Sequence, residues 1–224
     1  MKTTTTNLRT ALTRSLFTLL STATLAALGS TAQAQLYVAE YGSSRVGTYD
    51  ATTGVALNAN FISGIGEVFG LEIAGNNLFT GTFNSSAVNR YNATTGAVIN
   101  ASLINGLSNP YGMQIFGTDI FVASFNANTV GRYDATTGAA INASFITGLS
   151  GPVGIEVSGN DLYVSNFNGG KVGRYNETTG VAINANFITG LFNPGQMALA
   201  VPEPGTMGLL LLGGLALVRR RRVG

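Results

Sequence analysis

Three polar residues recur at one position of this sequence, 42 residues apart, each inside an apolar strand-like segment. They are Glu72, Gln114 and Glu156, and Ala198 holds the next equivalent position. Carboxylate and amide oxygens are the ligands that Ca²⁺ prefers. If these segments line a common channel, the three side chains form a hard-cation site. The alternative is that both carboxylates are solvated, or are satisfied by pairing between strands.

Three arginines keep the same spacing, each one residue before a tyrosine: Arg90, Arg132 and Arg174, with Thr48 at the first position. Guanidinium groups bind carboxylates and sulfates through paired hydrogen bonds. A ring of these cations could therefore bind sulfated or carboxylated sugars. Residues that recur at one position of a repeat usually stabilise the repeat structure. We therefore favour the structural alternative, in which each arginine pairs with an acidic residue or stacks on an aromatic ring.

The sequence has no histidine and no cysteine, so the commonest general base and the usual thiol nucleophile are both missing. It also lacks a Gly-x-Ser-x-Gly elbow and a phosphate-binding loop. These absences predict a protein that is not an enzyme. The enzymatic alternative left open is a metal-dependent hydrolase that uses Glu72 and Glu156.

The spacing of these residues comes from a 42-residue unit repeated four times without insertion, starting at Leu36, Leu78, Ile120 and Leu162. Each unit holds four short stretches rich in β-branched and aromatic residues, separated by turn residues. One turn has the form Asp/Asn-x-Thr-Thr-Gly. Its first side chain can accept backbone N–H groups two and three residues on, and its glycine supplies a positive φ. The turns begin at Asp50, Asn92, Asp134 and Asn176 and end at Gly54, Gly96, Gly138 and Gly180.

Four strands in about 40 residues are the signature of a β-propeller blade. The sequence predicts an all-β propeller of four 42-residue, four-stranded blades. The repeat region begins in a second strand at Leu36 and ends at 195–201 in a first strand. We expect this C-terminal strand to complete the first blade and close the ring, because closure leaves no exposed sheet edge. The alternatives are a β-solenoid and a larger ring made from two chains.

The order of strands within a unit resembles propellers of the NHL type. The end of the second unit and the start of the third show the pattern as Pro110-Tyr111-Gly112-Met113-Gln114-Ile115, then Ile120-Phe121-Val122-Ala123, then Val130-Gly131-Arg132-Tyr133-Asp134. The resemblance implies a propeller fold and no particular activity. In such a ring the first strands line the channel, so Glu72 and Glu156 would face each other across it. Lactonase-type propellers hold a metal there with Glu, Asn and Asp, and no matching Asp is evident in this sequence.

Two sets of mostly aromatic positions keep strict repeat phase, as packing between blades requires. We therefore predict that both belong to the core. They are Tyr41, Phe83, Phe125 and Phe167, and Phe61, Leu103, Phe145 and Phe187.

The N-terminus has the features of a secretory signal peptide over residues 1–34. Lys2, Arg9 and Arg14 precede an apolar run at 16–28, and Ala32-Gln33-Ala34 is a small-x-small cleavage site. The apolar run is shorter than the roughly 20 residues that a membrane span needs. The expected organisation is a signal peptide with a signal helix at 1–34, a propeller domain at 35–201 and a sorting segment at 202–224.

The C-terminus has three parts: Pro202-Glu203-Pro204, an apolar stretch at 207–218, and the cluster Arg219, Arg220, Arg221 and Arg222. The apolar stretch predicts a short hydrophobic helix, marginal for a stable span, and the arginines would hold its end on the cytoplasmic side. This order closely resembles the PEP-CTERM sorting signal of Gram-negative bacteria. The resemblance implies recognition by an exosortase-type transpeptidase, transient contact with the membrane, and a final place at the cell surface or outside the cell.

Charge excludes one class of partner. Between residues 35 and 204 there are five cations and all ten acidic residues, a net charge of −5, which disfavours nucleic acid. The expected function is that of an exported, non-catalytic binding or scaffold protein of the extracellular matrix, with polysaccharide or surface proteins as partners. The alternatives are the lactonase-like hydrolase with a channel metal and a saccharide-binding, lectin-like propeller that uses Arg90, Arg132 and Arg174. No cofactor is expected apart from Ca²⁺.

Overall fold

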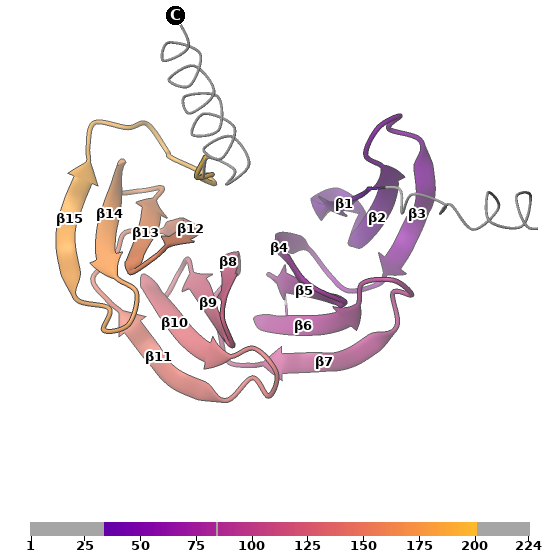
Figure 1. The fold of residues 1–224 in the computed structure, drawn as a ribbon, viewed down its shortest axis with the longest axis horizontal. Helices are drawn as coiled ribbons and strands as arrows, with labels where there is room; N and C mark the ends of the chain where they lie inside the picture. The colour runs from indigo at the N-terminus through magenta and orange to yellow at the C-terminus, as the bar shows by residue number, and fades with distance from the viewer. Residues whose placement is uncertain (1–33, 84, 201–224) are drawn as a thin grey trace, which may run out of the picture. The chain divides into compact units, whose positions relative to one another are not determined.

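The computed structural model describes residues 34–83 and 85–200, and these residues are almost entirely β-strand (Figure 1). The first sheet has three strands in the order β1 (Gln35–Glu40), β2 (Arg45–Asp50) and β3 (Ala56–Ser63). A short 3-10 helix, η1 (Tyr41–Ser43), follows β1. Each of the other three sheets has four strands in chain order.

The second sheet contains β4 (Val68–Ala74), β5 (Asn77–Thr82), β6 (Ala87–Asn92) and β7 (Val98–Ile104). The third contains β8 (Pro110–Phe116), β9 (Asp119–Ser124), β10 (Thr129–Asp134) and β11 (Ala140–Ile146). The fourth contains β12 (Pro152–Ser158), β13 (Asp161–Asn166), β14 (Lys171–Asn176) and β15 (Ala182–Ile188). All pairings recorded within these three sheets are antiparallel, so each is one blade of the predicted kind.

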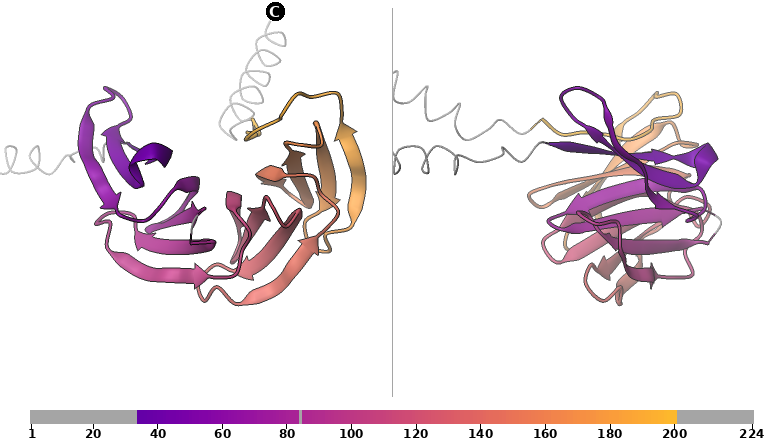
Figure 2. Two further views of the ribbon diagram at one scale, coloured as in Figure 1. Left: turned by 180° about the vertical axis from the view of Figure 1, so that it is seen from behind. Right: turned by 90° about the vertical axis from the view of Figure 1, so that its right-hand side faces the viewer.

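The described residues form two units: residues 34–38 with 47–59, and residues 39–46 with 60–200. The three four-stranded blades all belong to the larger unit. Within it, β4, β8 and β12 are the innermost strands of successive blades, and β7, β11 and β15 are the outermost (Figures 1 and 2). The radial order of strands confirms the propeller-type architecture of the repeats.

The predicted turn between the third and fourth strands of a blade is confirmed in every repeat. In the third blade, the Asp134 carboxylate accepts the backbone N–H groups of Thr136 and Thr137 at 3.0 and 2.7 Å. The same two bonds form at the other three turns. Gly138 ends its turn with a φ of +73°, a conformation that side chains disfavour.

The innermost strands of successive blades come into direct contact through their backbones. A Cβ atom on Gly70 of β4 would lie 2.0 Å from the carbonyl oxygen of Tyr111 on β8, and one on Gly112 would lie 2.2 Å from that of Val153 on β12. Only glycine fits such a contact. The repeated glycine of the innermost strand therefore sets the spacing between blades.

The hydrophobic core lies between neighbouring blades rather than within one sheet. One cluster joins the third and fourth blades and the other joins the second and third. Residues at the same repeat position, such as Leu78, Ile120 and Leu162, are 0–1% exposed. Each blade thus buries its faces against its neighbours, as a repeat architecture requires.

The predicted closing strand is not formed among the described residues. Residues 195–200 belong to no strand, and the first sheet has three strands instead of the four that were expected. An innermost strand forms by pairing with the second strand of its own blade. The second strand assigned to this segment by the prediction is β1, and β1 pairs only with β2 in the first sheet.

The predicted N-terminal signal helix and the C-terminal hydrophobic helix lie outside the described residues, as do Pro202, Glu203, Pro204 and the arginines at 219–222. The boundaries at residues 34 and 201 therefore stay predictions. Within residues 34–83 and 85–200, no helix has the length and apolar character that a membrane crossing requires.

Candidate functional site

Glu72 and Gln114 lie together, because β4 and β8 are adjacent innermost strands. The Glu72 carboxylate accepts the backbone N–H of Ile115 at 3.1 Å and the Gln114 side-chain amide at 3.3 Å through the same oxygen. Gln114 also donates to the carbonyl of Ile115 at 3.2 Å. Glu72 is thus a hydrogen-bond acceptor that links two blades, which matches the structural alternative for this position.

Burial raises the pKa of Glu72, the Ile115 N–H opposes that rise, and the charge of Glu156 adds to it. Burial also raises the pKa of Glu156. The charge of Glu156 thus contributes to the raised pKa of Glu72, as the smallest of its causes. Within the described residues, no three Asp, Glu, His or Cys side chains gather as a metal site would require. The Ca²⁺ site formed by Glu72, Gln114 and Glu156 stays a prediction.

The three arginines are bound into the blades that carry them. Arg132 lies 2.5 Å from Asp119 and 3.8 Å from Glu177, and its guanidinium lies over the rings of Phe121 and Phe145. Arg174 pairs with Asp161 at 2.7 Å and lies over Phe187. Arg90 donates to Asn77 at 2.9 Å. Asp119 and both rings lie on the blade of Arg132, whereas Glu177 lies on the next blade. Acid and aromatic partners are the arrangement of the structural alternative.

Two of these arginines also reach the next blade. Arg90 donates to the carbonyl of Thr136 at 2.9 Å, and Arg132 donates to the carbonyl of Thr178 at 3.0 Å. Both acceptors lie in the Asp/Asn-x-Thr-Thr-Gly turn of the following blade. No blade follows Arg174 in the described chain, and its buried Nε atom has no hydrogen-bond partner. These contacts link blades, and they leave the saccharide role of Arg90, Arg132 and Arg174 a prediction.

Six aromatic rings are connected across the larger unit, and we call them the aromatic row. Five of them follow one another from Tyr41 to Phe167, and Phe83 contacts Phe69 at the side of this line. Neighbouring ring centroids lie between 4.3 and 6.3 Å apart, the shortest distance being the stacked pair of Phe69 and Tyr111. Tyr41 is 50% exposed and the other five rings are partly exposed. The members are Tyr41, Phe69, Phe83, Tyr111, Phe125 and Phe167.

The aromatic row corrects the prediction that Tyr41, Phe83, Phe125 and Phe167 are core residues. Phe83, Phe125 and Phe167 each follow the last residue of a second strand and precede an asparagine, so they leave the sheet where the chain turns toward solvent. The available signal was this Phe-Asn pair at a strand end. In the second predicted set, Leu103 and Phe145 are buried as expected, whereas Phe187 is 44% exposed.

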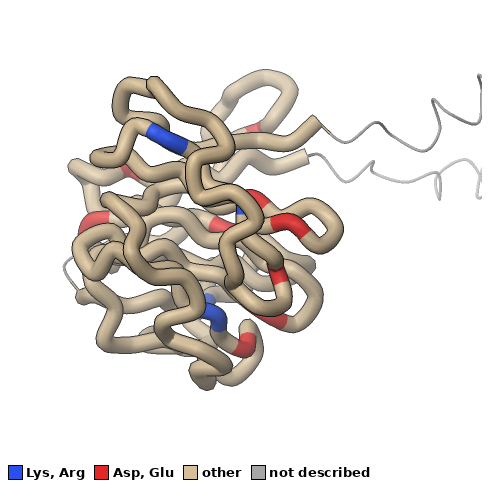
Figure 3. Tube along the Cα trace, turned by 90° about the vertical axis from the view of Figure 1, so that its left-hand side faces the viewer, with Lys and Arg blue, Asp and Glu red and all other residues tan. Residues whose placement is uncertain are grey.

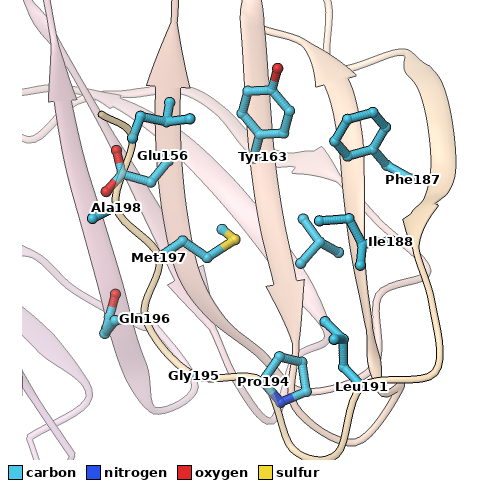
Figure 4. Close-up of a pocket in the computed structure, with 12 residues that line it drawn as sticks. Glu156, Tyr163, Phe187, Ile188, Leu191, Pro194, Gly195, Gln196, Met197 and Ala198 are labelled. Carbon is cyan, nitrogen blue, oxygen red and sulfur yellow. The ribbon is translucent and has the colours of Figure 1, made fainter. Parts of the chain in front are cut away.

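A cavity of about 570 Å³ lies beside the last blade (Figure 4). Phe187, Ile188 and Leu191 line one side of it, and Met197 and Leu199 of the segment after the last blade line another. Glu156 contributes the carboxylate in its wall. The lining is mainly apolar.

Charge is sparse over the described residues, and single acidic and basic positions are scattered along the chain (Figure 3). The exposed aromatic rings are therefore a more distinctive surface feature than any charged patch.

Comparisons with known proteins identify the C-terminal segment. Residues 200–222 match the model of the PEP-CTERM protein-sorting motif. This motif implies export, recognition by an exosortase, and a place at the surface of a Gram-negative cell or outside it. A comparison of the sequence with curated proteins finds no match.

Solved structures match the repeats in fold. A protein of unknown function from Desulfotomaculum acetoxidans aligns with a TM-score of 0.60 at 18% identity, covering 78% of this chain and 58% of that one. A catalytically inactive virginiamycin B lyase from Staphylococcus aureus, solved with quinupristin, aligns with a TM-score of 0.59 at 18% identity, covering 74% and 56%. The computationally designed protein Ika8 aligns with a TM-score of 0.55 at 13% identity, covering 75% and 50%.

This chain thus spans about half the length of the solved structures it matches. At these identities the likeness concerns the fold alone. The chain combines β-propeller-type repeats with a PEP-CTERM sorting motif.

Proposed function

We propose that this protein is an exported, non-catalytic binding scaffold whose aromatic row binds an extended partner, a polysaccharide of the extracellular matrix. The observation that carries the proposal is that six exposed or partly exposed rings, from η1 and three successive blades, lie in contact with one another. Contiguous exposed apolar surface on a soluble domain usually marks an interaction site. A row of flat rings supports contact with the apolar faces of successive sugar units.

The position of the row suits an extended ligand rather than a small one. Phe69 and Tyr111 lie on the innermost strands of consecutive blades, so their spacing is set by the packing of the blades and not by a flexible loop. A rigid surface loses little conformational entropy when it binds. The scarcity of charged residues favours a neutral or weakly charged chain over a strongly sulfated one.

The sorting motif supports binding outside the cell, because it implies export of the chain. A chain delivered to the cell surface meets extracellular polysaccharide, and its packed blades could hold that polymer near the cell. The finer role as a matrix scaffold is part of the proposal.

Two observations favour binding over catalysis. The inactive virginiamycin B lyase carries a histidine-to-alanine change, and this sequence has no histidine at any position. In the hydrolase alternative Glu72 and Glu156 must hold a metal ion, yet one Glu72 oxygen already accepts two hydrogen bonds. That alternative requires a chelator-sensitive activity that is lost in Glu72→Gln and Glu156→Gln.

The test is binding of the purified full chain, held in mild detergent, to neutral and acidic bacterial polysaccharides, measured by affinity electrophoresis and calorimetry. Tyr41→Ala and Tyr111→Ala should each weaken binding by roughly 5- to 100-fold. This range takes the stacking of an aromatic side chain on a flat ring of a nucleic-acid base, about 1–3 kcal/mol, as the scale for a ring stacked on a sugar. The matched control is Phe116→Ala, which removes a 39% exposed ring outside the row. Equal binding by all variants would overturn the proposal, and loss in Arg132→Lys alone would favour the arginine-based lectin.

A further inference from the structure

The last blade has an uncovered face that is built like an interface between blades. We call it the terminal face and define it by Phe187, Ile188 and Leu191, which are 44%, 45% and 38% exposed. One repeat earlier, Phe145, Ile146 and Leu149 are 8%, 3% and 8% exposed, and Leu103, Ile104 and Leu107 are 6%, 3% and 7% exposed. The same residues are buried wherever another blade follows, so the terminal face lacks a following blade.

The segment at 195–200 already occupies the place of the next innermost strand. A Cβ on Gly154 would lie 2.8 Å from the Gly195 carbonyl oxygen, the same contact that Gly70 and Gly112 make with the blades after them. Ser165 donates to that carbonyl at 2.6 Å, and Gln196 donates to the carbonyl of Val153 at 3.2 Å. Residues 195–200 thus start a blade beyond β15, and no described residue follows them to supply its second, third and fourth strands.

The first sheet has the three strands that such a blade lacks. Its β1 corresponds in the repeat to β5, β9 and β13, the second strands of their blades. Leu36 of β1 is 54% exposed, whereas Leu78, Ile120 and Leu162 at the same position are 0–1% exposed. A Cβ on Gly54 would meet open space, whereas one on Gly138 would meet the Leu103 carbonyl of the preceding blade. Among the described residues, this sheet contains no innermost strand, and no blade precedes it in the chain.

We propose that two copies of this chain join end to end, each supplying the three-stranded sheet that completes the blade started by residues 195–200 of the other. The joined blade covers the terminal face of the copy that starts it. Register follows from the repeat: Ile73 pairs with Leu78, Ile115 with Ile120, and Val157 with Leu162. Leu199 of one copy therefore pairs with Leu36 of the other.

The size of the matching folds favours a second copy as the occupant. About three quarters of this chain aligns with only 50–58% of each solved chain. The blades here are therefore arranged as in propellers whose chains supply about twice the repeat length. Two copies provide that length, and two identical joints related by a twofold axis close the assembly without a free edge.

Disulfide trapping tests this joint, because the native sequence has no cysteine. The full chain carrying Leu36→Cys and Leu199→Cys is oxidised in mild detergent and analysed by non-reducing electrophoresis and peptide mass mapping. Directly opposed residues of an antiparallel pair lie about 4.5–5.5 Å apart between Cα atoms, within the range of a disulfide. The expected product is a covalent dimer of twice the chain mass that contains the peptide pair of residues 36 and 199.

Three results would overturn the proposal. A linked chain of single mass would mean that the blade is completed within one copy. A ladder of higher multiples would mean an open chain of copies. No linkage beyond that of the control pair Leu36→Cys and Ile141→Cys, whose second site is 53% exposed on an outer strand, would mean that these strands do not meet.

A second measurement does not depend on the thiols. Ile188→Asp should convert the full chain from dimer to monomer in native mass spectrometry, because it places a carboxylate in the joint. Ile183→Asp, also on β15 and 50% exposed, should leave the dimer intact, because its repeat equivalents Ile99 and Ile141 stay exposed when blades follow. Dimer retained in both variants would contradict the assigned surface.

Discussion

At the scale of single residues, the polar positions locked to the repeat hold blades together. Glu72 accepts the N–H of the next innermost strand, and Arg90 and Arg132 each reach a carbonyl in the next turn. A buried backbone N–H left without an acceptor would cost about 1–3 kcal/mol. The need to satisfy such groups at each joint explains why acceptors and donors recur there.

Replacing Glu72 tests this role through the pH dependence of stability. Burial raises its pKa above 4.5, so the folded protein keeps this proton to higher pH than the unfolded chain. The contribution of the protonated carboxyl to stability is complete below about pH 4.5 and is lost as pH rises through the raised pKa. Glu72→Gln keeps an acceptor for Ile115 and removes the titration. Its free energy of unfolding relative to the native protein should therefore rise over that interval, measured by urea denaturation at successive pH values.

Asp134→Asn is the control for this measurement, since asparagine occupies the same turn position in other repeats. Hydrogen bonds from Thr137 and Thr136 lower the pKa of Asp134 below 3.8. The stability that the Asp134 carboxylate contributes is present above pH 3.8 and is lost as pH falls through the lowered pKa. The difference in free energy of unfolding from the native protein should therefore change below pH 3.8 for Asp134→Asn and above pH 4.5 for Glu72→Gln. A Glu72→Gln profile parallel to that of the native protein above pH 4.5 would show that the buried carboxyl does not titrate as described.

At the scale of elements, the Asp/Asn-x-Thr-Thr-Gly turn has two functions. It reverses the chain between the third and fourth strands through two bonds to its first side chain. Its final glycine also lets the turn lie directly on the outer strand of the preceding blade. In the third blade, a Cβ on Gly138 would lie 1.8 Å from the Leu103 carbonyl oxygen.

Gly138→Ala should therefore destabilise the protein by roughly 2–5 kcal/mol, combining a strained positive φ with a clash against fixed backbone. Gly117→Ala is the matched control, because Gly117 has a φ of +62° and open space around its Cβ position. It should lose only about 1–2 kcal/mol. Chemical denaturation of both variants measures the difference, and equal losses would mean that the turn does not press on the preceding blade.

At the scale of the whole molecule, the repeats form the proposed binding platform, and the sorting motif implies that this platform is exported. The sorting motif at 200–222 begins at the last residue that the structure describes. The segment that starts an extra blade, residues 195–200, directly precedes it. Removal of the tail after residue 201 would leave that segment in place for the joint between copies.

Glu203→Ala should block processing of the tail, because it removes the carboxylate from the sorting motif. The chain should then accumulate in the membrane fraction with its C-terminal peptide intact, as measured by mass spectrometry of the fractions from a host that has an exosortase. Glu177→Ala, a substitution outside the motif, is the control. Normal release of the Glu203→Ala chain would contradict recognition through this residue.

The sequence alone determined the repeat, its strands, the turns and the sorting motif, because these depend on local rules. Alternation of apolar residues predicts strands, and Asp, Asn and Gly at fixed spacing predict a turn from bonds within five residues. Four units of equal length also predicted the propeller-type fold. A sorting motif is read as a short segment, so its residues suffice to identify it.

Only the tertiary structure decided which repeated positions are covered. Phe125 and Phe145 each belong to a set of positions that recurs every 42 residues. Phe145 is nevertheless buried by the next blade, whereas Phe125 is partly exposed in the aromatic row. Phe145 and Phe187 are the same residue in the same position, and they differ because a blade follows one and not the other. Burial is a property of what packs against a residue, so the aromatic row and the terminal face became visible only once the blades were placed side by side.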